Sequence, residues 1–108
     1  MKIVKFDDRI EYHNELGQRH REDGPAVECL SGHKLWYQNG QLHRIDGPAR
    51  EYANGNKFWY QNNQLHRLDG PAFDGVDEKF EYYIYGREYT EFEFKFFSQA
   101  ILGNIIID

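Results

Sequence analysis

Three histidines recur at a fixed spacing, and three histidine side chains can bind zinc. His20, His43 and His66 each open the segment His-Arg-x-Asp-Gly-Pro-Ala, at intervals of 23 residues. In stacked hairpins, equivalent positions lie about two strand spacings, or roughly 9–10 Å, apart, whereas donors to one zinc ion lie within about 3–4 Å of each other. We therefore expect no metal, and a structural role in which each imidazole packs beside an aromatic residue and hydrogen-bonds the neighbouring unit. A pH-sensitive role is the remaining alternative.

The same segments carry charged residues that can pair or bind a partner. The arginines are Arg21, Arg44 and Arg67, and the aspartates two positions later are Asp23, Asp46 and Asp69. We expect surface or bend-stabilising pairs, which contribute about 0–1 kcal/mol each when exposed. The alternative is a regular row of charged side chains that binds a partner, with Arg44 and Arg67 as candidate binding residues.

Aromatic pairs recur with the same period and are the second set of candidate binding residues. The pairs are Trp36-Tyr37, Trp59-Tyr60 and, in a degraded copy, Tyr82-Tyr83. Neighbours in a strand point to opposite faces of the sheet, so we expect one member of each pair in the core and the other in an exposed or half-covered row. Tyrosine and tryptophan are favoured at protein interfaces. They also stack on bases, but a net charge of −5 does not suggest the basic groove of such binders, so direct nucleic-acid binding is not expected.

Catalytic motifs are missing from the sequence. It contains no glycine-rich phosphate loop, no nucleophile elbow and no His-Glu-x-x-His. An active site needs one set of different side chains gathered at a single place, whereas stacked equal units repeat the same side chains in rows. We expect a protein that is not an enzyme and has no cofactor.

The turns between the aromatic runs indicate how these residues are positioned. Asn39-Gly40 is a strong two-residue hairpin signal, Asn62-Asn63 can adopt the same turn, and Asn54-Gly55 turns the chain at the other end of the unit. The Asp-Gly-Pro step predicts a bend, with an Asx turn at the aspartate, unusual dihedrals at the glycine and no ladder bond at the proline. The sequence thus predicts a mainly β fold, an antiparallel meander of 23-residue hairpin repeats in a single curved sheet.

The two ends differ from the repeats, and residues 1–108 are expected to form one domain. Residues 1–16 form an N-terminal cap region with an opening strand at 2–6, and the first unit carries two extra residues between Tyr12 and His20. Residues 17–89 are the hairpin repeats. Residues 90–108 begin with a capping box at Thr90 and predict a helix over about 91–102 that covers the last sheet edge or one face. Its apolar stripe is Phe92, Phe96, Phe97, Ala100 and Ile101, and a closing strand is expected at Ile105-Ile106-Ile107.

Composition limits the cellular context. The single cysteine, Cys29, excludes an internal disulfide and is expected to be a packed thiol in a reducing compartment. The short apolar start and the lack of a run of about 20 apolar residues give no signal for secretion or membrane insertion. We expect a cytosolic protein without membrane contact.

The units resemble MORN-like hairpin repeats in the divergent form seen in small proteins of tailed phages and giant viruses. The resemblance rests on Trp36-Tyr37-x-Asn39-Gly40-x-Leu42-His43-Arg44-x-Asp46-Gly47-Pro48-Ala49 and its copies, and covers about residues 17–90. The ending 85–90 followed by a helix is also similar to the usual end of these chains. The departures are Asn63 for the hairpin glycine and Tyr89 for histidine.

This resemblance implies a phage or prophage origin and a site of action in the cytoplasm of the bacterial host. The leading hypothesis is a stoichiometric inhibitor that occludes a bacterial defence or nucleic-acid-processing protein, as anti-CRISPR proteins do. An antitoxin that neutralises a cognate toxin is the first alternative. A binding protein that sequesters a nucleotide or other small ligand on its aromatic row is the second. Self-association through an exposed sheet edge is a further expectation.

Overall fold

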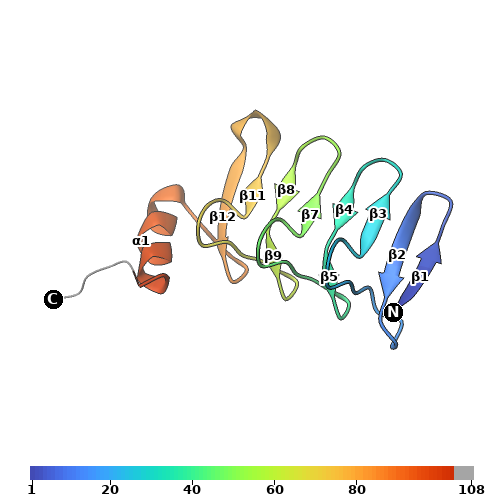
Figure 1. Ribbon diagram of the computed structural model, residues 1–108. Coiled ribbons are helices and arrows are strands. Elements are labelled where there is room, and N and C mark those ends of the chain that lie inside the picture. Colours follow the sequence, from blue (N-terminus) through green and yellow to red (C-terminus); the bar gives the residue numbers. More distant parts are fainter. Residues whose placement is uncertain (104–108) are drawn as a thin grey trace.

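The computed structural model describes residues 1–103. Successive hairpins form one open antiparallel sheet of nine strands, in the order β1-β2-β3-β4-β7-β8-β11-β12-β13, with a helix at the C-terminal end (Figure 1). The predicted mainly β hairpin meander with one C-terminal helix is confirmed. The strands of this sheet are β1 (Lys2–Lys5), β2 (Arg9–His13), β3 (Val27–Cys29), β4 (Lys34–Leu35), β7 (Arg50–Glu51), β8 (Lys57–Phe58), β11 (Phe73–Asp74), β12 (Phe80–Ile84) and β13 (Arg87–Tyr89).

Each regular unit also forms a second, smaller hairpin on the opposite side of the ribbon (Figure 1). These hairpins are β5 (Tyr37–Gln38) with β6 (Gln41–Leu42), and β9 (Tyr60–Gln61) with β10 (Gln64–Leu65). Trp36 separates β4 from β5 and Trp59 separates β8 from β9, whereas Tyr82 lies inside the continuous strand β12. The tryptophans therefore mark the places where the ribbon changes direction.

The small hairpins close through the turns that the sequence predicts. Asn39 and Gly40 have φ values of 48° and 81°, and Asn62 and Asn63 have 50° and 66°. Two successive positive φ angles are the requirement of a type I′ turn. In the last unit the same conformation falls on Tyr85, with φ 48°, a residue type that rarely adopts it. The ring of His66 stacks on Tyr85 with centroids 4.0 Å apart, which helps to hold this turn.

The glycine of each Asp-Gly-Pro bend serves a different purpose from the one predicted. Gly24, Gly47 and Gly70 are not among the glycines with positive φ, so the expectation of unusual dihedrals there was wrong. Each lies under an arginine side chain instead. A Cβ atom added to Gly47 would lie 2.7 Å from Cζ of Arg44. The missing side chain therefore makes room for the arginine.

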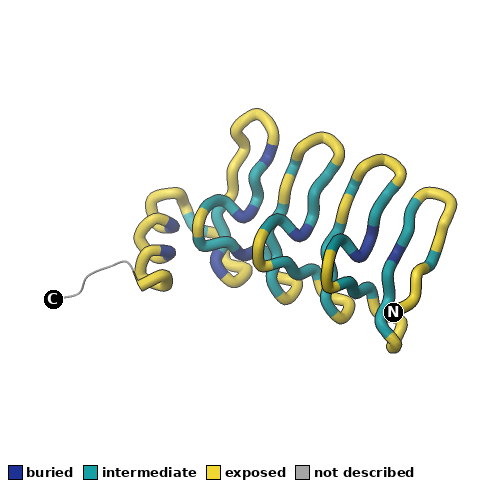
Figure 2. The backbone as a smooth tube through the Cα atoms, in the orientation of Figure 1, coloured by how far each residue is buried: buried dark blue, intermediate teal, exposed yellow. Residues whose placement is uncertain are grey.

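The buried core is thin and is centred on the bends. Ala26, Ala49 and Ala72 are completely buried at equivalent positions, and few other residues are (Figure 2). The molecule measures 55 × 32 × 19 Å, so a large share of each face is in contact with solvent. Cys29 is a free thiol and is half-buried.

A short 3-10 helix, η1 (Val76–Glu78), precedes β12, and the α-helix α1 (Glu91–Ile101) follows β13. The predicted capping box is present, because Glu93 N–H donates to Thr90 Oγ1 at 3.2 Å and Thr90 N–H donates to Glu93 Oε1 at 2.9 Å. Among residues 1–103, no helix has the length and apolar character needed to cross a bilayer. The strand expected at 105–107 lies outside the described residues.

The orientation of α1 differs from the prediction. Its buried residues are Phe94 and Ser98, and the ring of Phe94 packs against Tyr82 at 4.9 Å. The predicted stripe faces outward: Phe92 is 84% exposed and Phe96 is 59% exposed. The chain passes from β13 into the helix through the single residue Thr90, so this short connection fixes which side of the helix meets β12.

Candidate functional site

Cross-strand pairing sorts the candidate residues onto two faces of the ribbon. Glu11 pairs with Val27 and Val27 with Leu35, so these three side chains share one face. Tyr37 is on that face too, because Arg19 bonds both its hydroxyl and Glu11. We call this the tyrosine face, defined by Tyr37, Tyr60 and Tyr83. The opposite side is the bend face, defined by Trp36, Trp59 and Tyr82.

On the bend face the tryptophans are covered by arginines. Cζ of Arg44 lies 3.9 Å from the ring centroid of Trp36, and Cζ of Arg67 lies 3.8 Å from that of Trp59. Arg44 Nε donates to Asp46 at 3.1 Å, and Arg44 Nη1 donates to the Pro48 carbonyl at 3.1 Å. Each guanidinium therefore connects an aromatic ring to its own bend, and the pairs expected at the bends are present.

Tyr12 is a further ring covered by an arginine, and the alignment of the repeats by sequence missed it. Arg21 lies 4.0 Å above it, and Tyr12 N–H donates to the Ala26 carbonyl as Trp36 N–H donates to the Ala49 carbonyl. Tyr12 thus takes the place of Trp36 in the first unit. The unit consequently has one extra residue between this ring and its histidine, not two. The contact between the arginine and the proline carbonyl four residues later (Arg-x-x-x-Pro), rather than the count of residues, is the signal that aligns it.

The row of aromatic rings on the bend face ends at the helix. Tyr82 holds the fourth position, where Phe94 of α1 packs on its ring and its hydroxyl donates to Glu91 at 3.0 Å. Thr90 stands 23 residues after Arg67 and is the N-cap of α1. The helix therefore begins where the next stacking arginine would have been.

The histidines bind each unit to the next one. Nδ1 of His20 accepts from Asn39 N–H at 3.0 Å, and Nδ1 of His43 accepts from Asn62 N–H at the same distance. His66 accepts from Tyr85 N–H at 2.8 Å. An accepting Nδ1 requires the neutral ring. Within residues 1–103, no group of three or more His, Cys, Asp or Glu side chains is placed to hold a metal ion.

A groove of about 940 Å³ opens on the bend face between the first two bends. It is lined by Glu22, Pro25, Trp36, Gln38, Arg44 and Asp46, among others. Of its charged groups, Arg44 is already paired with Asp46. Opposite charges also alternate across neighbouring strands of this face, in the order Glu28, Lys34, Glu51, Lys57 and Asp74. Such a ladder is largely neutralised within the chain.

The tyrosine face presents hydroxyl groups at equivalent positions of successive units. Tyr37, Tyr60 and Tyr83 are all half-buried. Tyr37 accepts from Arg19 at 3.3 Å, and Tyr83 donates to Glu81 at 3.4 Å. Burial, and then the charges of Glu88 and Glu81, raise the pKa of Tyr83, so its hydroxyl stays protonated. The hydroxyl of Tyr60 makes no hydrogen bond to another residue of the described range 1–103.

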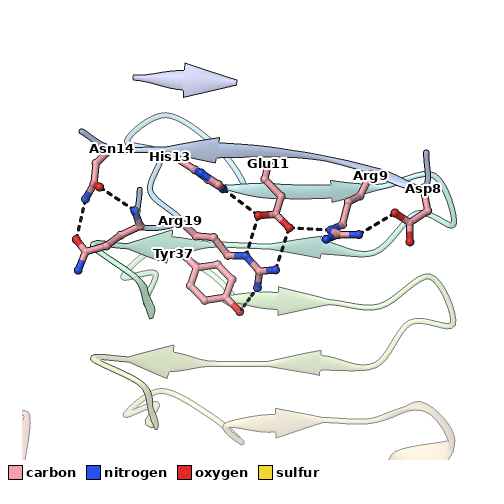
Figure 3. A network of polar contacts seen from close by, with 8 residues as sticks. Asp8, Arg9, Glu11, His13, Asn14, Arg19 and Tyr37 are labelled. Atoms are coloured by element: carbon pink, nitrogen blue, oxygen red, sulfur yellow. Dashed lines mark hydrogen bonds and ion pairs between the residues drawn. The ribbon is translucent and has the colours of Figure 1, made fainter. Parts of the chain in front are cut away.

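A buried ion cluster borders this face at its N-terminal end (Figure 3). Glu11 has a side chain only 5% exposed and accepts from Arg9 at 2.7 Å and Arg19 at 2.9 Å, with His13 Nε2 at 2.9 Å. Burial by itself raises the pKa of Glu11, but the hydrogen bonds of Arg19, His13 and Arg9 outweigh it and lower the pKa to about 2. The alternation Arg9-x-Glu11-x-His13 was a signal for this cluster that sequence reasoning missed.

The eight candidate binding residues therefore do not form one surface. Trp36, Arg44, Trp59, Arg67 and Tyr82 belong to the bend face, where their rings and charges contact other residues of the chain. Tyr37, Tyr60 and Tyr83 belong to the tyrosine face. No protein-family model, no curated protein and no solved structure matches this chain.

Proposed function

We propose that this chain is a non-catalytic binding module that docks a partner protein on its tyrosine face. The observation that carries the proposal is the row of Tyr37, Tyr60 and Tyr83, half-buried side chains that recur once per unit. Tyrosine combines a large apolar ring with a polar end, and it is enriched at protein interfaces. The rings on the other face support this assignment, because arginines or the helix already cover them.

The biological role that we propose is that of a small phage-encoded inhibitor which occludes a bacterial defence protein, as anti-CRISPR proteins do. An elongated body of 55 × 32 × 19 Å exposes much surface for its mass, which suits a protein that acts by covering another. The antitoxin alternative uses the same surface and differs in the identity of the partner. Sequestration of a nucleotide between aromatic rings is less well supported, since Arg44 and Arg67 occupy one side of each tryptophan.

The experiment is a pull-down from bacterial lysate with the tagged chain, followed by affinity measurement with the protein that it retains. Replacing Tyr37 and Tyr60 together with alanine removes two rings of the row and is expected to abolish retention. The matched control replaces Ile45 and Leu68, which occupy one equivalent position in two units outside the row. Thermal melts establish that both double variants remain folded.

The effect of each variant tests the docking surface, and the identity of the retained protein tests the biological role. Loss of the partner with the tyrosine variant but not with the control supports docking on the tyrosine face. Retention by both variants, or no retained protein, contradicts it. A retained defence protein supports the inhibitor role, and a retained toxin whose activity the chain relieves supports the antitoxin role.

A further inference from the structure

Arg50 interrupts a stretch of apolar side chains on the tyrosine face, which Glu11 and Glu81 flank at its two ends. Residues paired across successive strands form this stretch, in the order Val27, Leu35, Arg50, Phe58 and Phe73. By the period of 23, position 50 corresponds to Val27 and Phe73 in the adjacent units. Val27 is only 1% exposed. An arginine therefore stands where the fold places an apolar side chain.

The surroundings of Arg50 do not satisfy it. Its Nε atom is buried without a hydrogen-bond partner, and within residues 1–103 the side chain forms no ion pair. Its guanidinium lies 5.2 Å from the ring centroid of Tyr52 and 5.7 Å from that of Phe58. By contrast, Arg44 and Arg67 each bond an aspartate and a proline carbonyl. A buried donor without a partner is costly, so folding alone does not account for Arg50.

Arg50 also lies at the centre of the proposed docking surface. Its strand, β7, is the fifth of the nine in the sheet. The neighbouring strands β4 and β8 lead directly to Tyr37 and Tyr60. Residues that dominate binding energy cluster near the centre of interfaces and are enriched in tyrosine and arginine.

We propose that Arg50 is the anchor for a carboxylate of the partner protein, an aspartate or glutamate side chain seated beside the rings of Tyr52 and Phe58. This inference rests on the proposed docking of a protein on the tyrosine face. The two Nη atoms are the donors that a partner can reach, because Nε is closed off within the chain. The planar fork that they form matches a carboxylate through two parallel hydrogen bonds. The rings of Tyr52 and Phe58 shield part of the guanidinium from solvent, and a lower local dielectric strengthens such a contact.

The other cations beside this face are already paired, and its acidic residues Glu81 and Glu88 lie three or more strands away from β7. Arg9 and Arg19 are already paired with Glu11. A nucleic acid needs several free cations along its backbone, and the chain has a net charge of −5. A protein carboxylate therefore suits Arg50 better than a phosphate chain does.

The first experiment needs no partner and uses N-acetylglutamate as the probe. In a titration followed by NMR, the Nε–Hε signal of Arg50 is expected to shift and saturate. Arg87, whose guanidinium lies 5.3 Å from the ring of Tyr89, serves as the matched arginine and is expected not to shift. No shift at Arg50, or an equal shift at Arg87, overturns the site. A response to inorganic phosphate at lower concentration than to N-acetylglutamate overturns the carboxylate assignment.

The second experiment asks whether Arg50 serves the fold instead. Arg50→Val restores the residue type of the first unit, and the melting temperature is expected to stay the same or rise. A fall as large as that caused by Arg67→Val would overturn the proposal. Affinity for a partner retained in the pull-down is expected to fall about thirtyfold or more with Arg50→Val, as for a buried charge pair that loses one member. Undiminished affinity would overturn the anchor while leaving docking on the tyrosine face intact.

Discussion

Arg44 and Trp36 lie face to face, with Cζ of the guanidinium 3.9 Å from the ring centroid. The next unit repeats this contact between Arg67 and Trp59 at 3.8 Å. A ribbon with so thin a core needs other sources of stability. In these units, part of the apolar surface of each tryptophan is covered by a charged side chain that is itself tied to the bend.

The stack at the third bend is expected to be a main contributor to stability. Arg67→Met removes the cation–π contact, worth about 0.5–2 kcal/mol, and the charged hydrogen bonds to Asp69 and the Pro71 carbonyl. We expect the free energy of unfolding to fall by about 1–3 kcal/mol in urea titrations. Arg87→Met is the matched control, and an equal loss in both variants would contradict this prediction.

The glycines beneath the arginines give a graded prediction. A Cβ atom would lie 2.7 Å from the arginine Cζ at Gly47, 2.9 Å at Gly70 and 3.1 Å at Gly24. Alanine substitution should therefore destabilise in the order Gly47, Gly70, Gly24, by about 1–2 kcal/mol at Gly47, within the range for crowded substitutions. Urea titrations measure the series.

The cause is tested by a double-mutant cycle. In an Arg44→Met background, the loss caused by Gly47→Ala should become smaller, because the guanidinium that it would strike is gone. A loss of the same size in both backgrounds would mean that the bend itself, and not the arginine, needs the glycine.

The sequence predicted features that depend on a few adjacent residues. The Asn39-Gly40 turn follows from the backbone preferences of two residues, and the start of α1 follows from Thr90 and Glu93. The repeat period extended the hairpin pattern along the chain. These local signals were sufficient for the architecture of the sheet and for the helix.

Features that depend on register and on the docking of elements could not be predicted in the same way. Stacking of Arg44 on Trp36 requires the strand break at Trp36, and the unsatisfied Nε of Arg50 becomes apparent only once its cross-strand neighbours are known. The outward orientation of Phe96 follows from the short connection at Thr90, which overrides the larger apolar stripe. The aromatic pairs were identified correctly as neighbours on opposite faces. The expectation that one member of each pair lies in the core was wrong, because all six side chains are half-buried in this thin ribbon.

The bond between His66 and Tyr85 predicts a dependence of stability on pH. Burial lowers the pKa of His66 from its ordinary value of 6.5, so the unfolded chain binds more protons than the folded one in the window below that value. The contribution of His66 is complete above about pH 6.5 and is lost as the pH falls below it. Protonation also replaces the lone pair on Nδ1 that accepts from Tyr85 N–H.

The measurement is the free energy of unfolding by urea at pH 7.5 and at pH 5.5. The wild type is expected to be less stable at the lower pH, and His66→Gln is expected to reduce the difference. A difference of the same size in the variant would assign the dependence on pH to other groups.

The Glu11 cluster predicts a second loss of stability at lower pH. The pKa of Glu11 falls from an ordinary 4.5 to about 2 in the folded chain, so its contribution is complete above about pH 4.5 and is lost as the pH falls towards 2. A shift of this size corresponds to about 3 kcal/mol. Glu11→Gln leaves Arg9 and Arg19 without their shared carboxylate and should remove a comparable amount of stability at neutral pH.

Because the Glu11 cluster joins β2 to the turn that carries Arg19, hydrogen exchange should report the loss first in the amides of β1 and β2, before those of β8 and β11. Simultaneous loss of protection in both regions would show instead that the ribbon unfolds as one cooperative unit and that Glu11 stabilises all of it.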